Sequence, residues 1–495
     1  MGRAPWLIVA SVLGFFAAVK LHVAAAATEW EYDEGVYLCS ARALLRGYEL
    51  FTEIFSSQPP AFLESLALMM RVAGDTLVAA HVYILFFGLV TLAVCGELAR
   101  RIAGPWAAAG AVTALACVHT MLELSGLVQA ELPALALASC SLLLCLHARG
   151  RGWQRRWLLA SGALYGLSAL FKLYVVPIAV PLVLLLLLAP QAATNAESWS
   201  LDGRGWPLLR RTLQRACVLA AGAAIVAVVP LLVYEHEPFF DQAVAFHLAK
   251  LDEFRLNPSF NWSLVQGELR RSIGVSLIGA AGLVLLLRRR PTPALWLLAW
   301  LAASLLVILR QSPLFWRHLS LLLPPLCIAA GMAVAAAAQS RLRVIRIIAP
   351  AALLLLLGVT LDASLRPGWE PGRRARELVE APKSRPGLER MSQWLAENTR
   401  EDELVVSDDP ISVYLAGRMA PPALCDTSVA RIRSGYLRLS QLTGQDAATP
   451  VIMLRREGRL SMVIGYARWL KENYDQLDWD AEFGAERHVW LREDL

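Results

Sequence analysis

Apolar stretches long enough to cross a lipid bilayer recur along most of the chain, and this pattern limits the fold more than any other feature. About 20 apolar residues in a helix span the hydrocarbon core of a membrane. Segments that reach or approach this length lie near residues 5–25, 76–98, 105–121, 132–147, 157–171, 173–190, 216–234, 273–287, 294–309, 319–338 and 347–363. Several are short, and the two that flank Lys172 can also be read as one long broken helix. The sequence therefore predicts a mainly α, polytopic transmembrane bundle of about eleven helices.

The charge distribution sets the expected orientation of this bundle. Hydrophobic residues make up 57% of the chain and charged residues 18%, whereas apolar residues form only about 45–50% of a soluble domain. The formal net charge is +6, and the arginines lie in alternate short loops, at 100–101, 149–156, 204–215, 288–290 and 341–346. The positive-inside rule makes those loops cytoplasmic. The positive net charge is therefore explained by the orientation of the bundle in the membrane, and the sequence predicts no nucleic-acid partner.

This orientation makes the N-terminus cytoplasmic and the C-terminal portion extracytoplasmic, in a cell inner or plasma membrane. The N-terminal segment has a second interpretation, because an arginine, an apolar run and an A-x-A-like stretch are also typical of a cleaved signal peptide. Lys20 and His22 interrupt the apolar run, which favours a retained helix. In both interpretations the loop that follows lies outside the membrane.

The C-terminal part of the chain changes character and predicts a separate domain. We expect a transmembrane bundle over 1–363, a Pro/Gly/Arg-rich linker over 364–385 and a small extracytoplasmic α/β domain over 386–495. In that domain the segments "ELVVS", "LSMVIGY" and "HVWLR" are strand-like. Helices are expected through "LERMSQWLAENT", "VARIRSGYLRLSQL" and "ARWLKENYDQL". This alternation favours a mostly parallel sheet, and no Gly-rich phosphate loop accompanies it.

The outer loop over 28–75 carries the densest polar chemistry of the chain. It begins with Asp33 and Glu34, continues in a juxtamembrane helix to about residue 46, and is broken by "SSQPP" before a second short element. Two interpretations stay open from spacing alone. Either Asp33 caps the helix and Glu34 favours its first turn through the helix dipole, or the paired carboxylates form a reaction site at the membrane surface.

Further ionisable residues lie at expected outer boundaries of the membrane helices. Ionisable groups at membrane depth are costly and are usually functional or paired. Each also has a structural alternative: Glu131 as a helix cap, Lys172 as a side chain that reaches the interface, and Arg317 as a contact to lipid headgroups. Because these acidic and basic residues gather on one side of the bundle, we expect them to form a common site: Glu131, Lys172, Arg310, Arg317 and His318.

Four motifs resemble those of a known superfamily. They are "DEGVYLCSARALLRGYELF" at 33–51, "SSQPPAFL" at 56–63, "GLSALFKLYVVP" at 166–177 and "WRHLSLLLPPL" at 316–326. Together they resemble the GT-C superfamily of polyprenyl-phosphate-sugar-dependent membrane glycosyltransferases, in particular the protein mannosyltransferases of family 39 and the lipid A aminoarabinose transferases. The outer α/β domain fits the same architecture.

The resemblance implies an activity and a role for each matched residue. It implies transfer of a sugar from a polyprenyl-phosphate donor to a hydroxyl of a lipid, protein or glycan acceptor on the outer face, within a membrane-lipid environment. Asp33 would act as general base or acceptor orienter, with Glu34 as its neighbour, and Glu131 would share acceptor or metal binding. The donor phosphate would contact Lys172, Arg310, Arg317 and His318. Acceptor and loop positioning would fall to Tyr37, Gln58, Pro59 and Pro60. No cofactor is certain, and a divalent cation stays open.

Two positions depart from the pattern of the aminoarabinose transferases, where some members use an Arg before the motif's Tyr and a Lys before the Pro-Pro pair on the lipid phosphate. Here these positions are Val36 and Gln58. Either other cations rebuild the phosphate site, or the donor or the activity differs. Two other functional classes also remain: a transporter or flippase of a lipid-linked saccharide, and a sensor or scaffold built around the outer domain. We see no internal repeat of the kind that many transporters contain.

Overall fold

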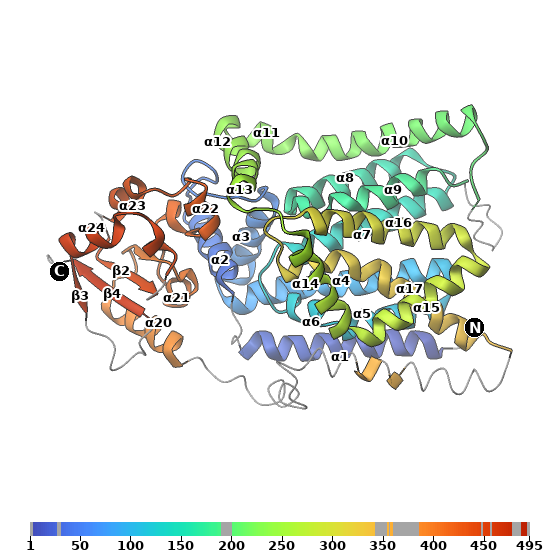
Figure 1. The fold of residues 1–495 in the computed structure, drawn as a ribbon, viewed down its shortest axis with the longest axis horizontal. Coiled ribbons are helices and arrows are strands. Elements are labelled where there is room, and N and C mark those ends of the chain that lie inside the picture. The colour runs from blue at the N-terminus through green and yellow to red at the C-terminus, as the bar shows by residue number, and fades with distance from the viewer. Residues whose placement is uncertain are drawn as a thin grey trace.

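The computed structural model describes residues 3–26, 31–189, 200–341, 354–355, 357–359, 386–446, 449–455, 458–477 and 487–492. Long helices run side by side in one bundle, and a small domain with a sheet covers one end of it (Figure 1). The N-terminus lies at the opposite end of the bundle from this domain (Figure 1). The predicted linker over 364–385 lies outside the described residues.

The bundle confirms the prediction of a polytopic helical protein. Among the described residues, six helices are long and apolar enough to cross a membrane, or seven if a pair bent by 93° forms one span. The bundle consists of α1 (Ala4–Ala26), α4 (Leu77–Ala103), α5 (Pro105–Cys117), α6 (His119–Leu124), α7 (Glu131–Gly150), α8 (Arg155–Phe171), η1 (Leu173–Ile178), α9 (Ala179–Leu186), α10 (Trp206–Ala227), α11 (Val229–Val233), α14 (Pro258–Arg271), α15 (Ile273–Arg289), α16 (Pro291–Arg310), η3 (Trp316–Leu322) and α17 (Leu323–Ala338). The bent pair is α14 and α15. The expected span at 347–363 lies almost entirely outside the described residues.

Small residues allow several helices to approach one another closely. Gly222 of α10 faces α8, and a Cβ there would lie 2.2 Å from the carbonyl oxygen of Leu159. In the reverse direction, a Cβ at Gly162 of α8 would lie 1.9 Å from the carbonyl oxygen of Leu219. Glycine is therefore required on both sides of this contact. Such small-residue seams are typical of helix pairs in membranes, where van der Waals packing replaces the hydrophobic effect as the driving force.

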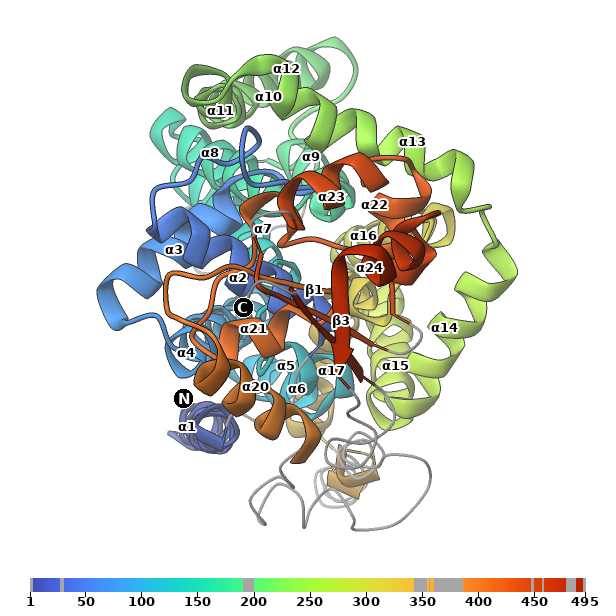
Figure 2. The same ribbon diagram turned by 90° about the vertical axis from the view of Figure 1, so that its left-hand side faces the viewer.

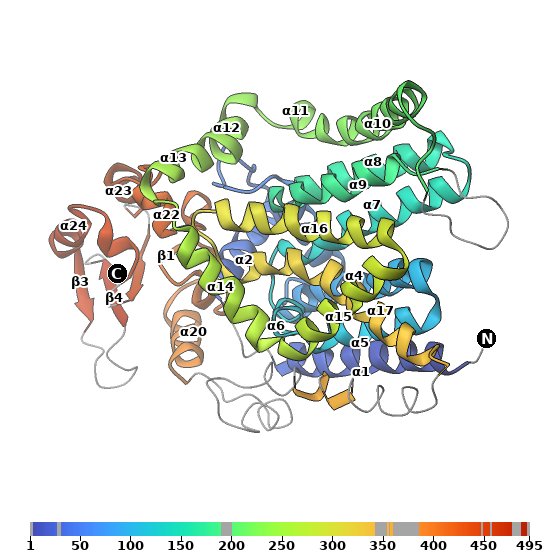
Figure 3. The ribbon, with the colours of Figure 1, turned by 45° about the vertical axis from the view of Figure 1, so that its right-hand side comes forward.

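The outer loop folds into two helices against the bundle, α2 (Tyr32–Leu45) and α3 (Ala61–Ala73). The predicted juxtamembrane helix is thus present. Glu31 occupies its N-cap position, and Asp33 and Glu34 lie in its first turn, so Asp33 does not cap the helix. A second connection, at the end of the bundle that faces the sheet domain, forms α12 (His236–Phe240), η2 (Asp241–Ala245) and α13 (Phe246–Glu253), which Figure 3 shows between the bundle and that domain.

The C-terminal domain has the predicted α/β composition, but its sheet is mixed. Its elements are α20 (Pro386–Asn398), β1 (Val405–Ser407), α21 (Pro410–Leu415), η4 (Pro422–Leu424), α22 (Val429–Arg433), α23 (Leu439–Asp446), β2 (Val451–Arg455), η5 (Leu460–Met462), α24 (Tyr466–Asn473), β3 (Tyr474–Leu477) and β4 (Arg487–Arg492). The strand order is β1-β2-β4-β3. Only β1 and β2 are parallel, whereas β4 is antiparallel to both of its neighbours. The expectation of a mostly parallel sheet was therefore wrong.

Three element assignments in this domain were also wrong. The segment "LSMVIGY" forms a short 3-10 turn and buries Leu460, Val463 and Tyr466 while Ile464 is exposed, a spacing of three that a strand does not have. The end of "ARWLKENYDQL" pairs with β4 as β3, so sheet contacts override its helical tendency. The expected helix through "VARIRSGYLRLSQL" is broken at Gly435, whose φ is +76°.

The domain is fixed to the bundle through α2, as Figure 2 shows with α21 lying over it. Gly35 makes the close approach possible, because a Cβ there would lie 2.4 Å from the backbone nitrogen of Ile411. Buried Arg42 donates hydrogen bonds to the carbonyl oxygens of Tyr414 and Arg418, at 2.8 and 2.9 Å, and pairs with Asp75 at 2.6 Å. These contacts hold the outer domain above the polar end of the bundle.

Candidate active site

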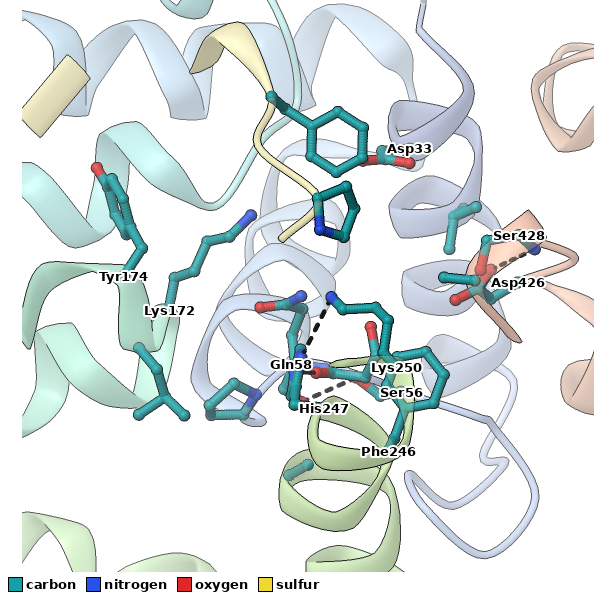
Figure 4. A pocket seen from close by; sticks show the side chains of 18 of the residues that line it. Asp33, Ser56, Gln58, Lys172, Tyr174, Phe246, His247, Lys250, Asp426 and Ser428 are labelled. Atoms are coloured by element: carbon teal, nitrogen blue, oxygen red, sulfur yellow. Dashed lines mark hydrogen bonds between the residues drawn. The ribbon is translucent and has the colours of Figure 1, made fainter. Parts of the chain in front are cut away.

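A cavity of about 420 Å³ lies where the bundle, the outer helices and the α/β domain meet. Its lining comes from several parts of the chain: the first turns of α2, the loop before α3 and the first turn of α3, the break after α8, η2 with α13, the end of α16 with the segment that follows it, the start of η3, and the outer domain. Figure 4 shows Asp33, Lys172, Lys250 and Asp426 around this space. Among the predicted site residues, the structure brings these to the cavity wall: Asp33, Tyr37, Gln58, Pro59, Lys172, Arg317 and His318.

Arg317 is the centre of an ionic cluster at one side of the cavity. Its guanidinium pairs with the carboxylate of Asp33 and lies 3.4 Å from Glu31. Its Nε lies 2.8 Å from Glu131 Oε1, an ionic contact without the alignment of a hydrogen bond. The side chain of Asp33 keeps 32% of its surface exposed, so one side of this carboxylate stays accessible to a ligand.

Glu131 and Lys172 form the buried part of the same cluster. Lys172 Nζ lies 2.7 Å from Glu131 Oε1, and the Glu131 side chain is fully buried. Lys172 occupies the break between α8 and η1 in extended backbone, and the hydroxyl of Tyr174 donates to the carbonyl of Glu131 at 2.5 Å. Glu131 therefore does not act as a simple helix cap, and Lys172 does not extend to a lipid interface. His318 Nε2 lies 3.6 Å from the same carboxylate oxygen.

Two cavity residues on α13 were missed by the sequence analysis. His247 Nε2 donates to the carbonyl of Ser57 at 2.6 Å, and Lys250 Nζ lies 3.4 Å from His247 Nδ1. Burial, together with the nearby Lys172, lowers the pKa of Lys250 to about 8, and burial lowers the pKa of His247 to about 4. Among the described residues Lys250 has no carboxylate partner within ion-pair distance. The only signal in the sequence was their i, i+3 spacing, which places both on one helix face.

The outer domain contributes a second carboxylate, Asp426, to the cavity wall. Its Oδ1 accepts from the backbone nitrogen of Ser428 at 2.8 Å and from the hydroxyl of Tyr32 at 3.3 Å. Burial raises the pKa of Asp426. No sequence pattern marked this residue, because it lies in a coil segment between η4 and α22 and reaches the site only through docking of the domain.

Four predicted site residues are not part of the cavity lining: Glu131, which lies behind it in the ionic cluster, and Glu34, Arg310 and Pro60. Glu34 is fully buried on another side of α2, where its Oε1 accepts from His81 at 2.7 Å and from the backbone nitrogen of Val128 at 2.9 Å. Arg310 is exposed at the end of α16, and Pro60 precedes α3 outside the lining. Asp33 and Glu34 are adjacent in sequence, but successive helix residues point about 100° apart, so only Asp33 faces the cavity.

The described residues also allow a test of the metal alternative. Among them, no group of three or more His, Cys, Asp or Glu side chains lies in an arrangement that would hold a metal ion. Two carboxylates of this site, Asp33 on the cavity wall and Glu131 behind it, are instead engaged with Arg317. We therefore derive no step that depends on a divalent cation.

One side of the cavity is apolar and continues to the outer surface of the bundle. Leu173, Val244 and Leu248 line the cavity and are 47%, 44% and 63% exposed. Along η1 and α9 the exposed Val176, Val180 and Val183 follow Leu173. Large exposed apolar surfaces of a membrane protein face lipid. The cavity thus joins a polar end, with Asp33 and Lys250, to an apolar surface of the bundle.

Comparisons with known proteins agree with this architecture. The family model described as dolichyl-phosphate-mannose-protein mannosyltransferase matches residues 57–201. The solved structure of ArnT from Cupriavidus metallidurans bound to undecaprenyl phosphate matches with a TM-score of 0.66 and 15% identity, over 99% of this chain and 98% of that one. The archaeal oligosaccharyltransferase AglB from Archaeoglobus fulgidus, in complex with an inhibitory peptide and a dolichol-phosphate, matches with a TM-score of 0.54 and 12% identity, over 94% of this chain and 72% of that one. A comparison with curated protein sequences finds no match.

These matches define the class of the protein. The chain is an integral membrane protein with the GT-C fold, as the motifs predicted. TM-scores of 0.66 and 0.54 establish a shared fold. At sequence identities of 15% and 12%, the activity of this chain has to be argued from the residues of its own site. In both of these solved structures the bound lipid carries a phosphate on a polyprenyl chain.

Proposed function

We propose that the protein is a glycosyltransferase that moves a sugar from a polyprenyl-phosphate donor to an acceptor hydroxyl on the outer face of the membrane. The observation that carries this proposal is one cavity that presents the Asp33 carboxylate together with the Lys172 and Lys250 ammonium groups, at one end of an apolar surface. A lipid-linked donor needs all three features: an apolar path for its tail, cations for its phosphate and a base for the acceptor.

The apolar side of the cavity fits the prenyl tail. In this arrangement the tail follows the exposed residues after Leu173 and passes Val244 and Leu248, so that the phosphate enters the polar end. Burial of each methylene against such a surface contributes about 0.8 kcal/mol. The tail would therefore supply much of the binding free energy, whereas the polar end would determine where the phosphate stops.

Lys250 is the cation best suited to the donor phosphate. Lys172 and Arg317 are already paired with carboxylates, whereas Lys250 is paired with none among the described residues. His247 orients Lys250. Its Nε2 donates to the carbonyl of Ser57, so its Nδ1 can only accept a hydrogen bond from the ammonium group of Lys250. Val36 and Gln58, at the two positions where some relatives have cations, also line the cavity. We therefore place the phosphate nearest to Lys250, with Lys172 as the second cation.

Asp33 would act as the general base of the transfer. Its carboxylate takes the proton of the acceptor hydroxyl, the hydroxyl oxygen forms a bond to the anomeric carbon, and the bond between that carbon and the phosphate oxygen breaks. The polyprenyl phosphate leaves with the bonding electron pair and an extra negative charge, which Lys250 and Lys172 stabilise. Arg317 is a positioning residue in this scheme, because its ion pair holds the carboxylate of Asp33 at the cavity wall.

The same scheme assigns supporting roles to the remaining predicted residues. Glu131 would hold Lys172 and Arg317 in position through its ion pairs with both. Tyr37 and Pro59 would form part of the cavity wall. Glu34 would support α2 through His81 rather than react. We propose that the N-terminus is cytoplasmic and the α/β domain extracytoplasmic, in accordance with the arginine-rich loops. No observation among the described residues specifically favours the transporter alternative.

The test is release of free polyprenyl phosphate from a panel of labelled polyprenyl-phosphate sugars by the purified protein in lipid nanodiscs. Asp33→Asn keeps the shape of the side chain and removes the base, so release should fall by about 10²–10⁴-fold. Asp402→Asn is the matched control, because Asp402 is an exposed carboxylate of the outer domain beside Arg400. Thermal unfolding and polyprenyl-phosphate binding of both variants establish that they are folded.

The outcomes separate the parts of the proposal. Equal release by wild type and Asp33→Asn would exclude Asp33 as the base. Absence of release from every donor by the wild type, with polyprenyl phosphate bound, would contradict a lipid-linked sugar as the donor.

A further inference from the structure

A second cavity, of about 580 Å³, lies at the other end of the bundle, where α8 and α10 begin. Figure 1 shows this end on the side away from the α/β domain. Its lining contains four arginines and two tryptophans: Arg155, Arg210, Arg211, Arg215, Trp153 and Trp206. The positive-inside rule places this end at the cytoplasmic surface. Nothing in the proposed transfer reaction uses these residues.

Two of the four arginines are already committed to the protein. Arg211 and Arg215 both pair with the carboxylate of Asp202, and Arg215 also donates to the carbonyls of Leu186 and Leu188 at 2.7 and 3.2 Å. The guanidinium of Arg215 lies 4.4 Å from the centre of the Trp153 ring. These contacts form a fixed base for the cavity.

The other two arginines leave an excess of positive charge. Arg155 and Arg210 are exposed and, in the part of the chain that the structure describes, have no carboxylate within ion-pair distance. The lining therefore holds four guanidinium groups, of which two share one carboxylate, Asp202. A charge excess of this kind at one site favours an anion with several acceptor oxygens, because the planar guanidinium group donates in pairs to phosphate oxygens.

The remaining lining distinguishes a lipid from a soluble anion. Leu158, Leu213 and Val218 continue the cavity from the arginines along α8 and α10. Leu213 is 53% exposed and Trp206 is 71% exposed, on a helix that presents most of its surface to the outside of the bundle. Tryptophan is typical of the boundary between headgroups and acyl chains. A soluble phosphate would contact the arginines alone, whereas a phospholipid would contact both the arginines and the apolar wall.

We propose that this cavity binds an anionic phospholipid of the leaflet on that side. Its phosphate lies between Arg155 and Arg210, and an acyl chain lies along Leu213 and Val218 of α10. Basic pockets between membrane helices on the cytoplasmic side are suited to such headgroups. The lipid would also complete the packing of α10, which contacts the bundle mainly through its glycine seam with α8.

The test is native mass spectrometry of the full-length protein, released from detergent, with phosphatidylglycerol titrated against phosphatidylcholine. Arg155→Gln/Arg210→Gln removes the two uncommitted charges at exposed positions, so folding should be retained. Arg288→Gln/Arg289→Gln is the matched control, because it removes two exposed arginines that line no described cavity at the end of α15. At roughly fivefold per arginine, the first variant should bind phosphatidylglycerol about 25-fold more weakly, and the control within about twofold of wild type.

Three outcomes would overturn the proposal. Equal weakening in both variants would show diffuse attraction to a basic surface. Equal binding of phosphatidylcholine would show that the headgroup charge has no role. Displacement of the lipid by an equimolar concentration of soluble pyrophosphate would assign the site to a soluble anion. Retention of phosphatidylglycerol against excess pyrophosphate, with loss only in the Arg155→Gln/Arg210→Gln variant, is the expected result.

Discussion

Lys250→Gln should weaken binding of polyprenyl phosphate while it stabilises the folded protein. In the structure Lys250 contacts His247 and lines the cavity without a carboxylate partner among the described residues. A hydrogen bond from a charged group to phosphate contributes about 1.5–3 kcal/mol. The substitution should therefore weaken binding by about 10–150-fold, measured as the concentration of polyprenyl phosphate that produces half of the maximal thermal shift.

The stabilisation follows from the pKa of the same side chain. The pKa of Lys250 is about 8 in the folded protein, chiefly because of burial, and about 10.4 in an unfolded chain. The folded state therefore binds fewer protons between these values, and its stability rises with pH through this window. At pH 7 the charged lysine costs at most about 3 kcal/mol, which partial exposure reduces to about 1–2 kcal/mol. Lys250→Gln removes this cost.

The assay is thermal unfolding of the ligand-free protein and of its polyprenyl-phosphate complex at pH 7 and pH 9.5. Without ligand, Lys250→Gln should melt above the wild type at pH 7, and the difference should shrink at pH 9.5. Wild-type affinity should fall as the pH rises above 8, because the free lysine loses its charge, and the variant should lack this dependence. Lys471→Gln, on an exposed part of α24, is the control. A lower melting temperature at pH 7, or affinity within twofold of wild type, would refute this reasoning.

Two further predictions concern packing. Arg42→Met should destabilise docking of the outer domain by about 2–3 kcal/mol, because it removes a buried guanidinium that bonds two carbonyls of that domain and Asp75. Hydrogen exchange should then increase in α21 and α2, and unchanged exchange there would contradict the assignment. Gly222→Leu should lower the melting temperature because its side chain has no space beside the Leu159 carbonyl. Gly267→Leu, in open space on α14, should leave the melting temperature near the wild-type value, and equal effects of the two would argue against the seam.

The bundle was predictable because its signal is local. A membrane helix must satisfy its own backbone hydrogen bonds and must be apolar over its whole length, so each span can be recognised from its own residues. The helix of the outer loop was predictable for a similar reason. The sheet of the α/β domain was not, because strand direction depends on which segments pair, and β3 is a strand only through its contact with β4.

The candidate site was predictable only where a residue conflicted with its surroundings. Lys172 interrupts an apolar run and Arg317 begins one, so their placement required an explanation and the structure brings them together through Glu131. Lys250 and Asp426 lie in polar segments where charged residues are ordinary. Their presence at the cavity depends on the docking of α13 and of the outer domain, which no local pattern encodes.

The departures at Val36 and Gln58 are best understood through the charge of the whole cavity. A phosphate is attracted by any ammonium group within a few ångströms, from whichever element it comes, since Coulomb interaction has no preferred direction. Lys172 and Arg317 are neutralised by Glu131 and Asp33. The absence of cations at positions 36 and 58 is therefore offset only if another element supplies one. In the proposed scheme Lys250 meets this condition. It is buried near Lys172, which together with burial lowers its pKa to about 8, and among the described residues no carboxylate lies within ion-pair distance of it.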